Sequence, residues 1–319
     1  MHKDYPVITV LICTYNRAQY LEQVLLSFER QTISQDRFEI VIINDGSADD
    51  TANVADHFKG RLPIRYLYHD NAGLAASKNR GITESKSPIV LFMDDDDIAS
   101  PKLLEEHIKA HQKYPDDNYA VLGFTDLDMA IAANPLMEYV TKYGSFLFSY
   151  SSLHDGEILN YKYFWGGRTS CKIGYLEKYG VFNPAFKFGC EDIELGYRLS
   201  LHDLKVVYHK QAKSVMIRLL SIDDFFQRLI KQGESQYVLS KLHDSSEIKR
   251  WAEIDNAEEV WQDVAYVFKQ LLNSARKLDL LVNTRIAEGL DVDDYTMRLL
   301  HRSYWNAFKA CKLKGINQR

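Results

Sequence analysis

The chain has 319 residues, of which 46% are hydrophobic and 26% are charged, and its formal net charge is −5 at pH 7. This composition is typical of a globular protein with a substantial core and enough chain for an appended subdomain. A net negative charge argues against the basic surface that nucleic-acid-binding proteins present, so we expect no nucleic acid among the partners.

The sequence carries no segment that predicts a transmembrane helix. No apolar run approaches the roughly 20 residues needed to cross a bilayer, and Met1–Asp4 leads into a strand-like run rather than into a signal peptide. The four cysteines, at positions 13, 171, 190 and 311, form no CxxC pair, which argues against a zinc knuckle or a disulfide framework. We therefore expect a cytoplasmic protein, and peripheral membrane contact stays open as an alternative.

Five short apolar runs between residues 7 and 124 have the length and the β-branched or aromatic composition of buried strands. Segments with helical spacing separate them, and this alternation predicts an α/β fold with a mostly parallel sheet flanked by helices. The predicted strands are Val7–Cys13, Phe38–Ile43, Ile64–Tyr68, Pro88–Met93 and Tyr119–Phe124. The predicted helices follow Asn16 and Ser47, span Gly73–Thr83, and begin after Ser100, which can cap a helix with Pro101 in its first turn.

Polar clusters come at the ends of three predicted strands, at residues 14–16, 44–47 and 94–97. A fourth, Glu191-Asp192, begins a helical pattern. Because the carboxyl ends of parallel strands meet at one edge of a sheet, we expect the first three clusters to converge where open α/β folds bind ligands. A nucleotide together with a metal ion suits such a set of side chains.

Thr14, Asn16 and Asp45 supply a hydroxyl, an amide and a carboxylate, which can bond to a base or to a ribose. The alternative for the segment 44–47 is a simple turn that caps the next helix. Its position between a strand and a helix favours binding.

The segment Asp70–Gly81 opens another helix and carries two cations, Lys78 and Arg80. Backbone N–H groups at a helix start, together with a nearby cation, favour a phosphate. The alternative is a solvated helical face from which both cations point outward.

The four carboxylates of Asp94–Asp97 follow a run that is too apolar to lie on the surface. Adjacent carboxylates repel one another, so such a cluster is costly unless cations neutralise it. Oxygen ligands of this kind suit Mg²⁺ or Mn²⁺, which can bridge the phosphates of a nucleotide. Spacing alone does not fix which of the four bind the metal, and a helix-capping role for Asp97 or Ser100 is also compatible with the pattern.

Glu191 and Asp192 are preceded by glycine at position 189 and begin a helix. A carboxylate at that position can face a cleft and act as a general base, whereas the alternative is that the helix dipole simply favours acidic residues in the first turn. Upstream, Trp165 can stack on a ligand, and Gly166-Gly167 would allow close approach to the backbone. A tryptophan in the core is the alternative for Trp165.

The segments Val7–Phe28, Ile40–Asp50, Asp70–Gly81, Val90–Pro101 and Trp165–Leu199 together resemble successive motifs of family-2 glycosyltransferases. The resemblance covers about the first two thirds of the chain. Each motif is weak by itself, but their order and spacing are specific. The resemblance implies a GT-A fold, a nucleotide-sugar donor, a divalent metal, Mn²⁺ or Mg²⁺, and inversion at the anomeric carbon.

The resemblance also implies roles for individual residues. On the donor side, Thr14 and Asn16 join Asp45, which grips the nucleoside. Lys78, at a position where arginine is more usual, serves the diphosphate. Asp96 is the metal ligand with Asp94 as its partner, and Asp95 lies close to the ribose. On the acceptor side, the implied residues are Asp192 as the catalytic base, Glu191 as the residue that positions the acceptor or the base, and Trp165 as the residue that stacks on an acceptor sugar.

The chain departs from the family pattern at one position. Many members supply a late histidine to the metal, and counting forward from Val206–Tyr208 reaches Met216 instead. His202 and His209 are nearby in sequence but out of register, so we assign neither. Fewer protein ligands would then hold the metal.

We interpret residues 1–216 as a GT-A catalytic domain, in which 1–124 form the nucleotide-sugar-binding half and 125–216 the acceptor-side half. Residues 217–319 form a helical C-terminal region. Apolar residues at positions 261, 264, 265, 268, 271, 272, 275 and 278 make a stripe with helical spacing. We expect that stripe to be buried, on the catalytic domain or on a second copy in a homo-oligomer.

The leading hypothesis is an inverting, metal-dependent glycosyltransferase. It would move a sugar from a nucleotide-sugar donor, UDP-linked, to a hydroxyl of a glycan, lipid-linked or protein acceptor. One alternative is a nucleotide-sugar-binding scaffold without turnover. Another is a sugar-nucleotide pyrophosphorylase, although that class usually has a glycine-rich loop where this chain has Thr14–Arg17.

Overall fold

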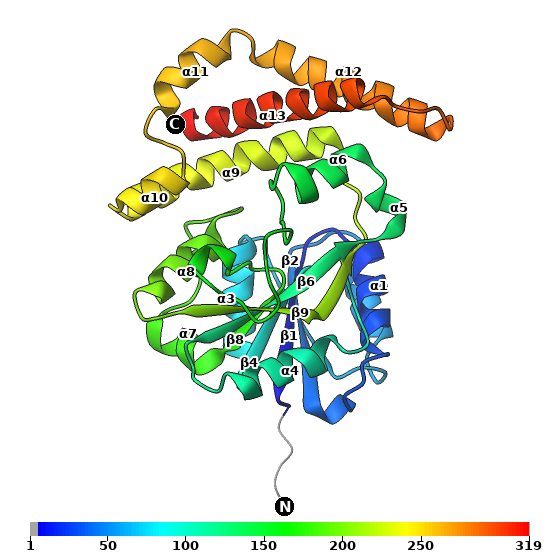
Figure 1. Cartoon of the computed structure of the whole chain (residues 1–319). Coiled ribbons are helices and arrows are strands. Elements are labelled where there is room, and N and C mark those ends of the chain that lie inside the picture. The colour runs from blue at the N-terminus through cyan, green and yellow to red at the C-terminus, as the bar shows by residue number, and fades with distance from the viewer. Residues whose placement is uncertain (1–5, 319) are drawn as a thin grey trace, which may run out of the picture. The chain divides into compact units, whose positions relative to one another are not determined.

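The computed structural model describes residues 6–318, which form two compact units whose elements are labelled in Figure 1. Unit 1 contains the chain up to Asp128, together with Ser152–Lys187 and Glu191–Arg218. Unit 2 contains Met129–Ser151, Phe188–Cys190 and the chain from Leu219 onward. The segment Met1–Asp4 lies outside the described residues. The functional division at residues 124 and 216 stays a prediction.

Unit 1 is built on a mixed sheet with the strand order β3-β2-β1-β4-β8-β6-β9-β5, and β7 also pairs with β9. The strands are β1 (Ile8–Thr14), β2 (Phe38–Asp45), β3 (Ile64–His69), β4 (Ile89–Met93), β5 (Asp97–Ala99), β6 (Tyr119–Leu127), β7 (Ile158–Leu159), β8 (Thr169–Lys172) and β9 (Lys205–Met216). β3, β2, β1 and β4 are parallel, and β6 is parallel to β9. β8 runs antiparallel to both β4 and β6, and β5 and β7 run antiparallel to β9. The five predicted strands are present, which confirms the predicted α/β class.

Alternating residues of β1 face opposite layers of helices. Ile8, Val10 and Ile12 belong to an apolar cluster that includes residues of α1, α2 and α4. Leu11 points the other way, against Gly81 of α3, where an added Cβ would lie 2.1 Å from a Leu11 methyl carbon. The helices of unit 1 are α1 (Ala18–Phe28), α2 (Thr51–His57), α3 (Leu74–Glu84), α4 (Leu103–Lys113), α7 (Ile173–Tyr179) and α8 (Glu191–Ser200), with short 3₁₀ turns at Gln35–Arg37 and Tyr161–Tyr163. The sheet is therefore buried on both faces, as its nearly continuous apolar strands require.

The predicted capping of α4 is wrong in its detail. The residue that precedes the helix is Lys102, and it makes no side-chain cap. Ser100 instead accepts the N–H of Leu103 through its backbone carbonyl, at 3.0 Å. Asp97 does not cap a helix either, because it begins β5 and pairs with Met216 of β9. Strand pairing thus takes Asp97 into the sheet, which leaves its carboxylate buried.

Unit 2 is helical. Its elements are α5 (Met129–Ala132), α6 (Pro135–Glu138), a π-helical turn (Tyr139–Tyr143), α9 (Ile222–Leu242), α10 (Ser246–Trp251), α11 (Ala257–Ala265), α12 (Phe268–Ala287) and α13 (Asp294–Asn317). Two glycines let α9 and α13 pack backbone to backbone. An added Cβ would lie 2.2 Å from the Lys312 carbonyl oxygen at Gly233, and 1.9 Å from the Ile230 carbonyl oxygen at Gly315. Phe308 of α13 packs against Phe225 of α9, with ring centroids 4.8 Å apart.

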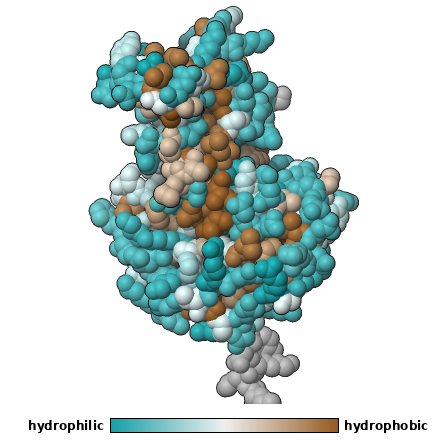
Figure 2. Space-filling view, turned by 90° about the vertical axis from the view of Figure 1, so that its right-hand side faces the viewer, coloured by the Kyte–Doolittle hydropathy of each residue, from teal (hydrophilic) through white to brown (hydrophobic). Residues whose placement is uncertain are grey.

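The predicted apolar stripe of the C-terminal region is only partly buried. It is divided between α11 and α12, and of its members Leu272 and Ala275 are buried. Other apolar side chains of unit 2 reach solvent, among them Tyr266 at 86% and Leu280 at 68% exposure. Figure 2 shows apolar residues among hydrophilic ones on the face that it presents. Within residues 6–318, no helix is both long enough and apolar enough to cross a membrane.

Candidate active site

Asn16, which was predicted to bind the nucleotide-sugar donor, connects the ends of β1 and β2. Asn16 has a left-handed backbone with φ of 52°, a conformation that asparagine tolerates better than most residues. Its N–H donates to the Ser47 hydroxyl at 2.8 Å, and its side-chain oxygen accepts the N–H of Ala48 at 2.8 Å. Thr14 is buried at the end of β1. Asn16 therefore braces two loops and holds the β1 and β2 ends at one edge of the sheet.

Asp45 ends β2, and backbone groups hold its carboxylate in place. Oδ1 accepts the N–H of Ala72 at 2.8 Å, and Oδ2 accepts the N–H of Gly73 at 3.1 Å. Gly46 follows with φ of 83°, and an added Cβ there would lie 2.7 Å from the amide nitrogen of Asn71. Asp45 is thus fixed against the loop that leads into α3, and each of its oxygens keeps a further lone pair for a ligand.

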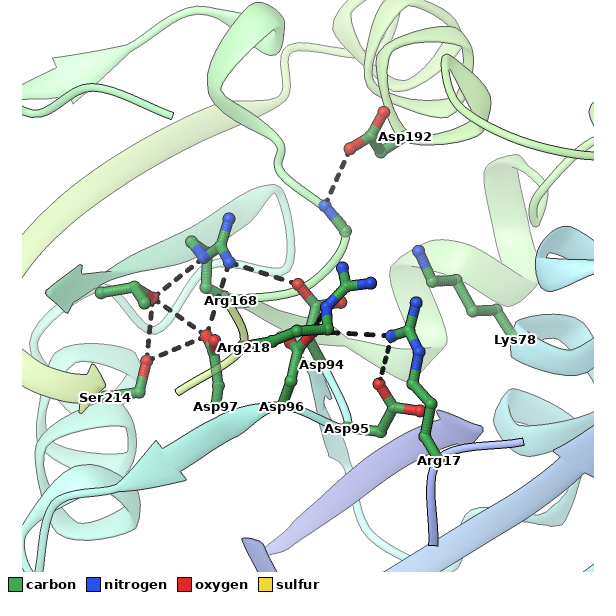
Figure 3. A network of polar contacts seen from close by, with 12 residues as sticks. Arg17, Lys78, Asp94, Asp95, Asp96, Asp97, Arg168, Asp192, Ser214 and Arg218 are labelled. Carbon is green, nitrogen blue, oxygen red and sulfur yellow. Dashed lines mark hydrogen bonds and ion pairs between the residues drawn. The ribbon is translucent and has the colours of Figure 1, made fainter. Parts of the chain in front are cut away.

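The four carboxylates of Asp94–Asp97 face three arginines from distant parts of the chain (Figure 3). Arg17 Nη1 lies 2.6 Å from Asp95 and 3.6 Å from Asp96. Arg168 Nη2 lies 3.2 Å from Asp94 and 3.4 Å from Asp97. Arg218 Nε lies 2.5 Å from Asp96 Oδ2. The predicted cluster of acids therefore exists, and guanidinium groups offset part of its negative charge.

Exposure differs sharply among the four aspartates. The side chain of Asp94 is 43% exposed, whereas those of Asp95, Asp96 and Asp97 are almost fully buried. Burial, followed by the charges of neighbouring aspartates, raises the pKa of Asp97 to about 7 against the pull of Arg168. Burial also raises the pKa of Asp95 to about 6, although Arg17 opposes it. The three arginines therefore do not fully offset the negative charge.

A second charged group lies where α3 and α8 supply side chains to the same place. Lys78 Nζ donates to Glu191 Oε1 at 3.0 Å, and both side chains are buried. Burial disfavours the charge of Lys78, but Glu191, Asp192 and Asp94 together raise its pKa above the usual value, so it is a cation. Lys78 also lies over the Phe182 ring, 5.0 Å from the centroid. Lys78, which we predicted to bind a phosphate, therefore interacts with the Glu191-Asp192 pair in this structure.

Asp192 lies in the first turn of α8 and has a half-buried carboxylate. Its Oδ2 accepts the N–H of Gly166 at 3.0 Å, and its Oδ1 accepts its neighbour's N–H, that of Ile193, at 2.8 Å. Burial, then repulsion by Glu191, raises the pKa of Asp192 to about 6, while Lys78 opposes the shift. A carboxylate with a pKa near neutrality is suited to accept a proton from a hydroxyl.

The Gly166-Gly167 turn connects the two charged groups. An added Cβ on Gly167 would lie 2.1 Å from Asp94 Oδ2, and one on Gly166 would lie 2.5 Å from Lys78 Nζ and 3.2 Å from the Asp192 Cβ. The N–H of Asp94 donates to the Gly167 carbonyl at 3.2 Å. A ligand was predicted to approach these glycines, but in this structure their nearest neighbours include the side chains of Asp94, Asp192 and Lys78. The turn brings Asp94 and Asp192 to one place.

Trp165 precedes this turn and is half-buried. Its indole N–H donates to the Lys162 carbonyl at 2.9 Å, and its ring lies 5.6 Å from that of Tyr163. Its assignment to an acceptor stays a prediction.

The residues present fit a divalent ion, although residues 6–318 hold no cluster of three or more His, Cys, Asp or Glu side chains arranged for one. Mg²⁺ commonly uses only one or two carboxylates, with substrate phosphates and water as further ligands. Asp96 Oδ2 is buried and makes an ion pair but no hydrogen bond among the described residues. The assignment of Asp94 and Asp96 as the oxygen ligands of such an ion stays a prediction.

Met216, where a family histidine was expected, is buried at the end of β9. The nearby histidines have other partners, since His209 Nε2 lies 2.9 Å from Glu106 and His202 stacks on Tyr179. Arg218, two residues after Met216, reaches Asp96 instead. Sequence analysis assigned no role to Arg17, Arg168 or Arg218. Arg17 and Arg168 directly follow predicted site segments, and Arg218 lies two residues beyond Met216, so their position in the sequence was the available signal.

Part of the chain is similar to proteins of known class. Residues 9–144 match the family model described as glycosyl transferase family 2. Validoxylamine A glucosyltransferase of Streptomyces hygroscopicus subsp. jinggangensis is 28% identical over 234 residues, which cover 65% of this chain and 54% of that protein. The chain spans about half the length of the curated relatives that head this comparison.

Two solved structures share the fold at low sequence identity. The mannosyltransferase PcManGT from Pyrobaculum calidifontis, in complex with GDP-Man and Mn²⁺, has a TM-score of 0.59 and 15% identity, with 95% of this chain and 86% of that chain covered. Staphylococcus aureus TarS 1-349 in complex with UDP has a TM-score of 0.54 and 14% identity, with 97% and 90% covered. The family model over residues 9–144 and the named relatives support a family-2 glycosyltransferase, and the two solved structures support a GT-A-like α/β fold.

Proposed function

We propose that this protein is an inverting, divalent-metal-dependent glycosyltransferase that moves a sugar from a UDP-linked donor to a hydroxyl of a glycan, lipid-linked or protein acceptor. One observation carries the proposal. The Gly166-Gly167 turn contacts both Asp94 and Asp192, so the acidic cluster and a candidate general base share one place. The nucleotide-sugar and UDP complexes of the structural neighbours support the donor class.

Asp192 would take the proton of the acceptor hydroxyl as its oxygen attacks the anomeric carbon from the side opposite the nucleotide. The oxygen–carbon bond forms while the bond between the sugar and the diphosphate breaks, so the leaving group is a nucleoside diphosphate. The raised pKa of Asp192, about 6, suits a base that must be ionised near neutral pH and still hold a proton. The N–H of Gly166 fixes Oδ2 and thereby directs the carboxylate.

On the donor side, the chain's own residues would bind and orient the nucleotide. Asp45 and Asn16 would serve the nucleoside, because both are held rigidly at the ends of their strands. Asp94 and Asp96 would hold Mn²⁺ or Mg²⁺. When bound, the ion offsets the charge that develops on the leaving diphosphate.

The test is nucleotide release from a panel of UDP-, GDP- and dTDP-sugars with Mn²⁺, with and without candidate acceptors. We expect release from a UDP-sugar and an Asp192→Asn variant that binds UDP normally but turns over about 10²–10⁴-fold more slowly, the range for losing a general base. Asp203→Asn, on an exposed turn beyond α8, is the matched control. Binding of UDP without turnover of any donor would favour the scaffold alternative.

A further inference from the structure

We propose that Arg218 is an exchangeable counter-ion of Asp96, which withdraws from that carboxylate when a divalent cation binds and then contacts the diphosphate of the donor. This inference deepens the proposed function and rests on it for the identity of the donor. It assigns a role to a residue that none of the sequence motifs includes.

The first step is the position of Arg218. Its Nε lies 2.5 Å from Asp96 Oδ2, and that oxygen is inaccessible to solvent. A cation that is to bind Oδ2 must therefore take the place of the guanidinium. Arg17 also approaches this oxygen but from 3.6 Å, because its main partner is Asp95 at 2.6 Å. Arg218 is the closer of the two to the predicted metal ligand.

The second step is the charge around Asp96. Six carboxylates lie near four basic side chains here, so the net charge of the group is negative when all are ionised. The carboxylates are those of Asp94, Asp95, Asp96, Asp97, Glu191 and Asp192, and the basic side chains are those of Arg17, Lys78, Arg168 and Arg218. A diphosphate adds further negative charge, so repulsion weakens the binding of a donor to this cluster when no divalent cation is present. A divalent cation at Asp96 replaces the single positive charge of Arg218 by two. The released guanidinium can then turn toward the donor and offset part of the charge of its diphosphate.

The third step is that the backbone at Arg218 can stay in place while the side chain moves. The N–H of the preceding Ile217 donates to the backbone carbonyl of Asp96 at 3.0 Å, which anchors the chain beside the cluster. The side chain of Arg218 is 20% exposed, whereas that of Arg168 is 11% exposed and is tied to Thr125 as well as to its two aspartates. Arg218 Nε also makes no hydrogen bond of good geometry to a described residue. Of these two arginines, Arg218 is the one with fewer bonds to break.

The fourth step is chemical. A guanidinium presents several N–H donors in one plane, and this geometry suits bidentate bonds to phosphate oxygens. A lysine would supply the charge without that geometry, so Arg218→Lys should separate the two functions of the side chain.

The experiment measures two affinities in the full chain. Mn²⁺ binding in the absence of nucleotide is followed by electron paramagnetic resonance, and UDP binding is followed by calorimetry with EDTA and with Mn²⁺. We expect Arg218→Gln to bind Mn²⁺ about tenfold more tightly, because no guanidinium competes for Asp96. With Mn²⁺ saturating, the same variant should bind UDP about tenfold more weakly, because the diphosphate loses charge-assisted bonds. Arg218→Lys should keep Mn²⁺ affinity near that of the wild type and lose part of the UDP affinity.

The control is Arg61→Gln, which removes an exposed arginine that pairs with Glu29 and should change neither affinity. Thermal unfolding verifies that each variant is folded. If Arg218→Gln does not fold, the UDP affinity of Arg218→Lys provides the test. Equal or weaker Mn²⁺ binding by Arg218→Gln would overturn the exchange, and so would a Lys variant that binds UDP like the wild type. If the wild type releases nucleotide from no donor, the proposed function fails, whereas the Mn²⁺ measurement still decides whether Arg218 competes for Asp96.

Discussion

Asp45 and Asp96 are both buried carboxylates just beyond or at the end of a parallel strand, but they are neutralised in different ways. Asp45 accepts two backbone N–H groups, those of Ala72 and Gly73, which cannot leave without unfolding the loop. Asp96 is paired with side chains of Arg218 and Arg17, which can rotate away. The first arrangement is fixed and the second is exchangeable.

This difference teaches how one sheet edge can be rigid and still accept a charged ligand. Backbone donors hold a carboxylate in a permanent geometry, which suits recognition of a neutral nucleoside. Arginine side chains offset the charge of a carboxylate until another cation replaces them, which suits a metal and a diphosphate that bind together. Substitution of Asp96 should therefore mainly lower turnover, whereas substitution of Asp45 should mainly lower the stability of the folded protein.

Of the substitutions that test this comparison, Asp96→Asn should have the largest effect. The amide keeps the shape of the side chain but removes the charge that would hold the metal, so turnover should fall by about 10²–10³-fold or more. UDP binding in EDTA should not weaken, because a negative charge has left the donor site. Nucleotide release at saturating Mn²⁺ measures the effect, with Asp56→Asn, an exposed partner of Lys59, as control. Normal turnover would show that the carboxylate of Asp96 is not needed to hold the metal.

Gly167→Ala should give the next largest effect. The new Cβ would lie 2.1 Å from Asp94 Oδ2, so the carboxylate of Asp94 must move. A displacement of about 1 Å near reacting groups can cost about 10²-fold in rate. Turnover should fall while the folded state persists.

The matched substitution is Gly174→Ala in α7, where no atom lies within 4 Å of the new Cβ. That variant should keep full turnover and gain about 0.5–1 kcal/mol in the free energy of unfolding, because alanine is the better helix former. If both glycine variants behave alike, the Gly166-Gly167 turn does not hold Asp94 in its working position.

Asp45→Ala tests the fixed side of the comparison. It removes the acceptor of two backbone N–H groups, so we expect a loss of about 1–3 kcal/mol in the free energy of unfolding. UDP should also bind more weakly, because the loop that leads into α3 is released. Urea unfolding measures the stability, and Asp70→Ala, exposed on the same loop, should change it little. Unchanged stability would mean that the two bonds to Asp45 are dispensable.

The strands were predictable because buried parallel strands read as short, nearly continuous apolar runs. β1, β2, β3, β4 and β6 lie where those runs lie. The position of Asp94–Asp97 followed from the same logic, since a charged cluster after a buried strand must lie at a strand end. What sequence could not give is β8, an antiparallel strand of four residues between β4 and β6. Too few residues were involved for a pattern to emerge.

The arginines could not be predicted for a related reason. Arg17, Arg168 and Arg218 come from segments far apart in the chain, and only the folded sheet brings them to the aspartates. The spacing of an isolated arginine carries no information about its partner. Met216 illustrates the limit, because counting along β9 found the correct neighbourhood but not the side chain two residues further that reaches Asp96.

The smallest effect that we predict is a dependence of stability on pH, which distinguishes the Asp94–Asp97 cluster from the rest of unit 1. Burial raises the pKa of Asp97 from 3.8 to about 7, so the folded protein holds this proton more tightly than the unfolded chain does. The contribution of Asp97 to stability is therefore greatest below pH 4 and is lost as the pH rises toward 7. Burial lowers the pKa of His107 and His111, which produces the opposite slope.

Comparing the melting temperatures of the wild type and Asp97→Asn cancels the contribution of His107 and His111, because both proteins contain these two histidines. Relative to the wild type, the variant should become more thermally stable as the pH rises from 5 to 8, by an amount on the order of a few °C. Mn²⁺ with UDP should reduce that gain, because added positive charge lowers the cost of ionising Asp97 in the wild type. A difference in melting temperature that stays constant from pH 5 to 8 would mean that Asp97 is ionised throughout, and that Arg168 with its hydroxyl partners already neutralises this part of the cluster.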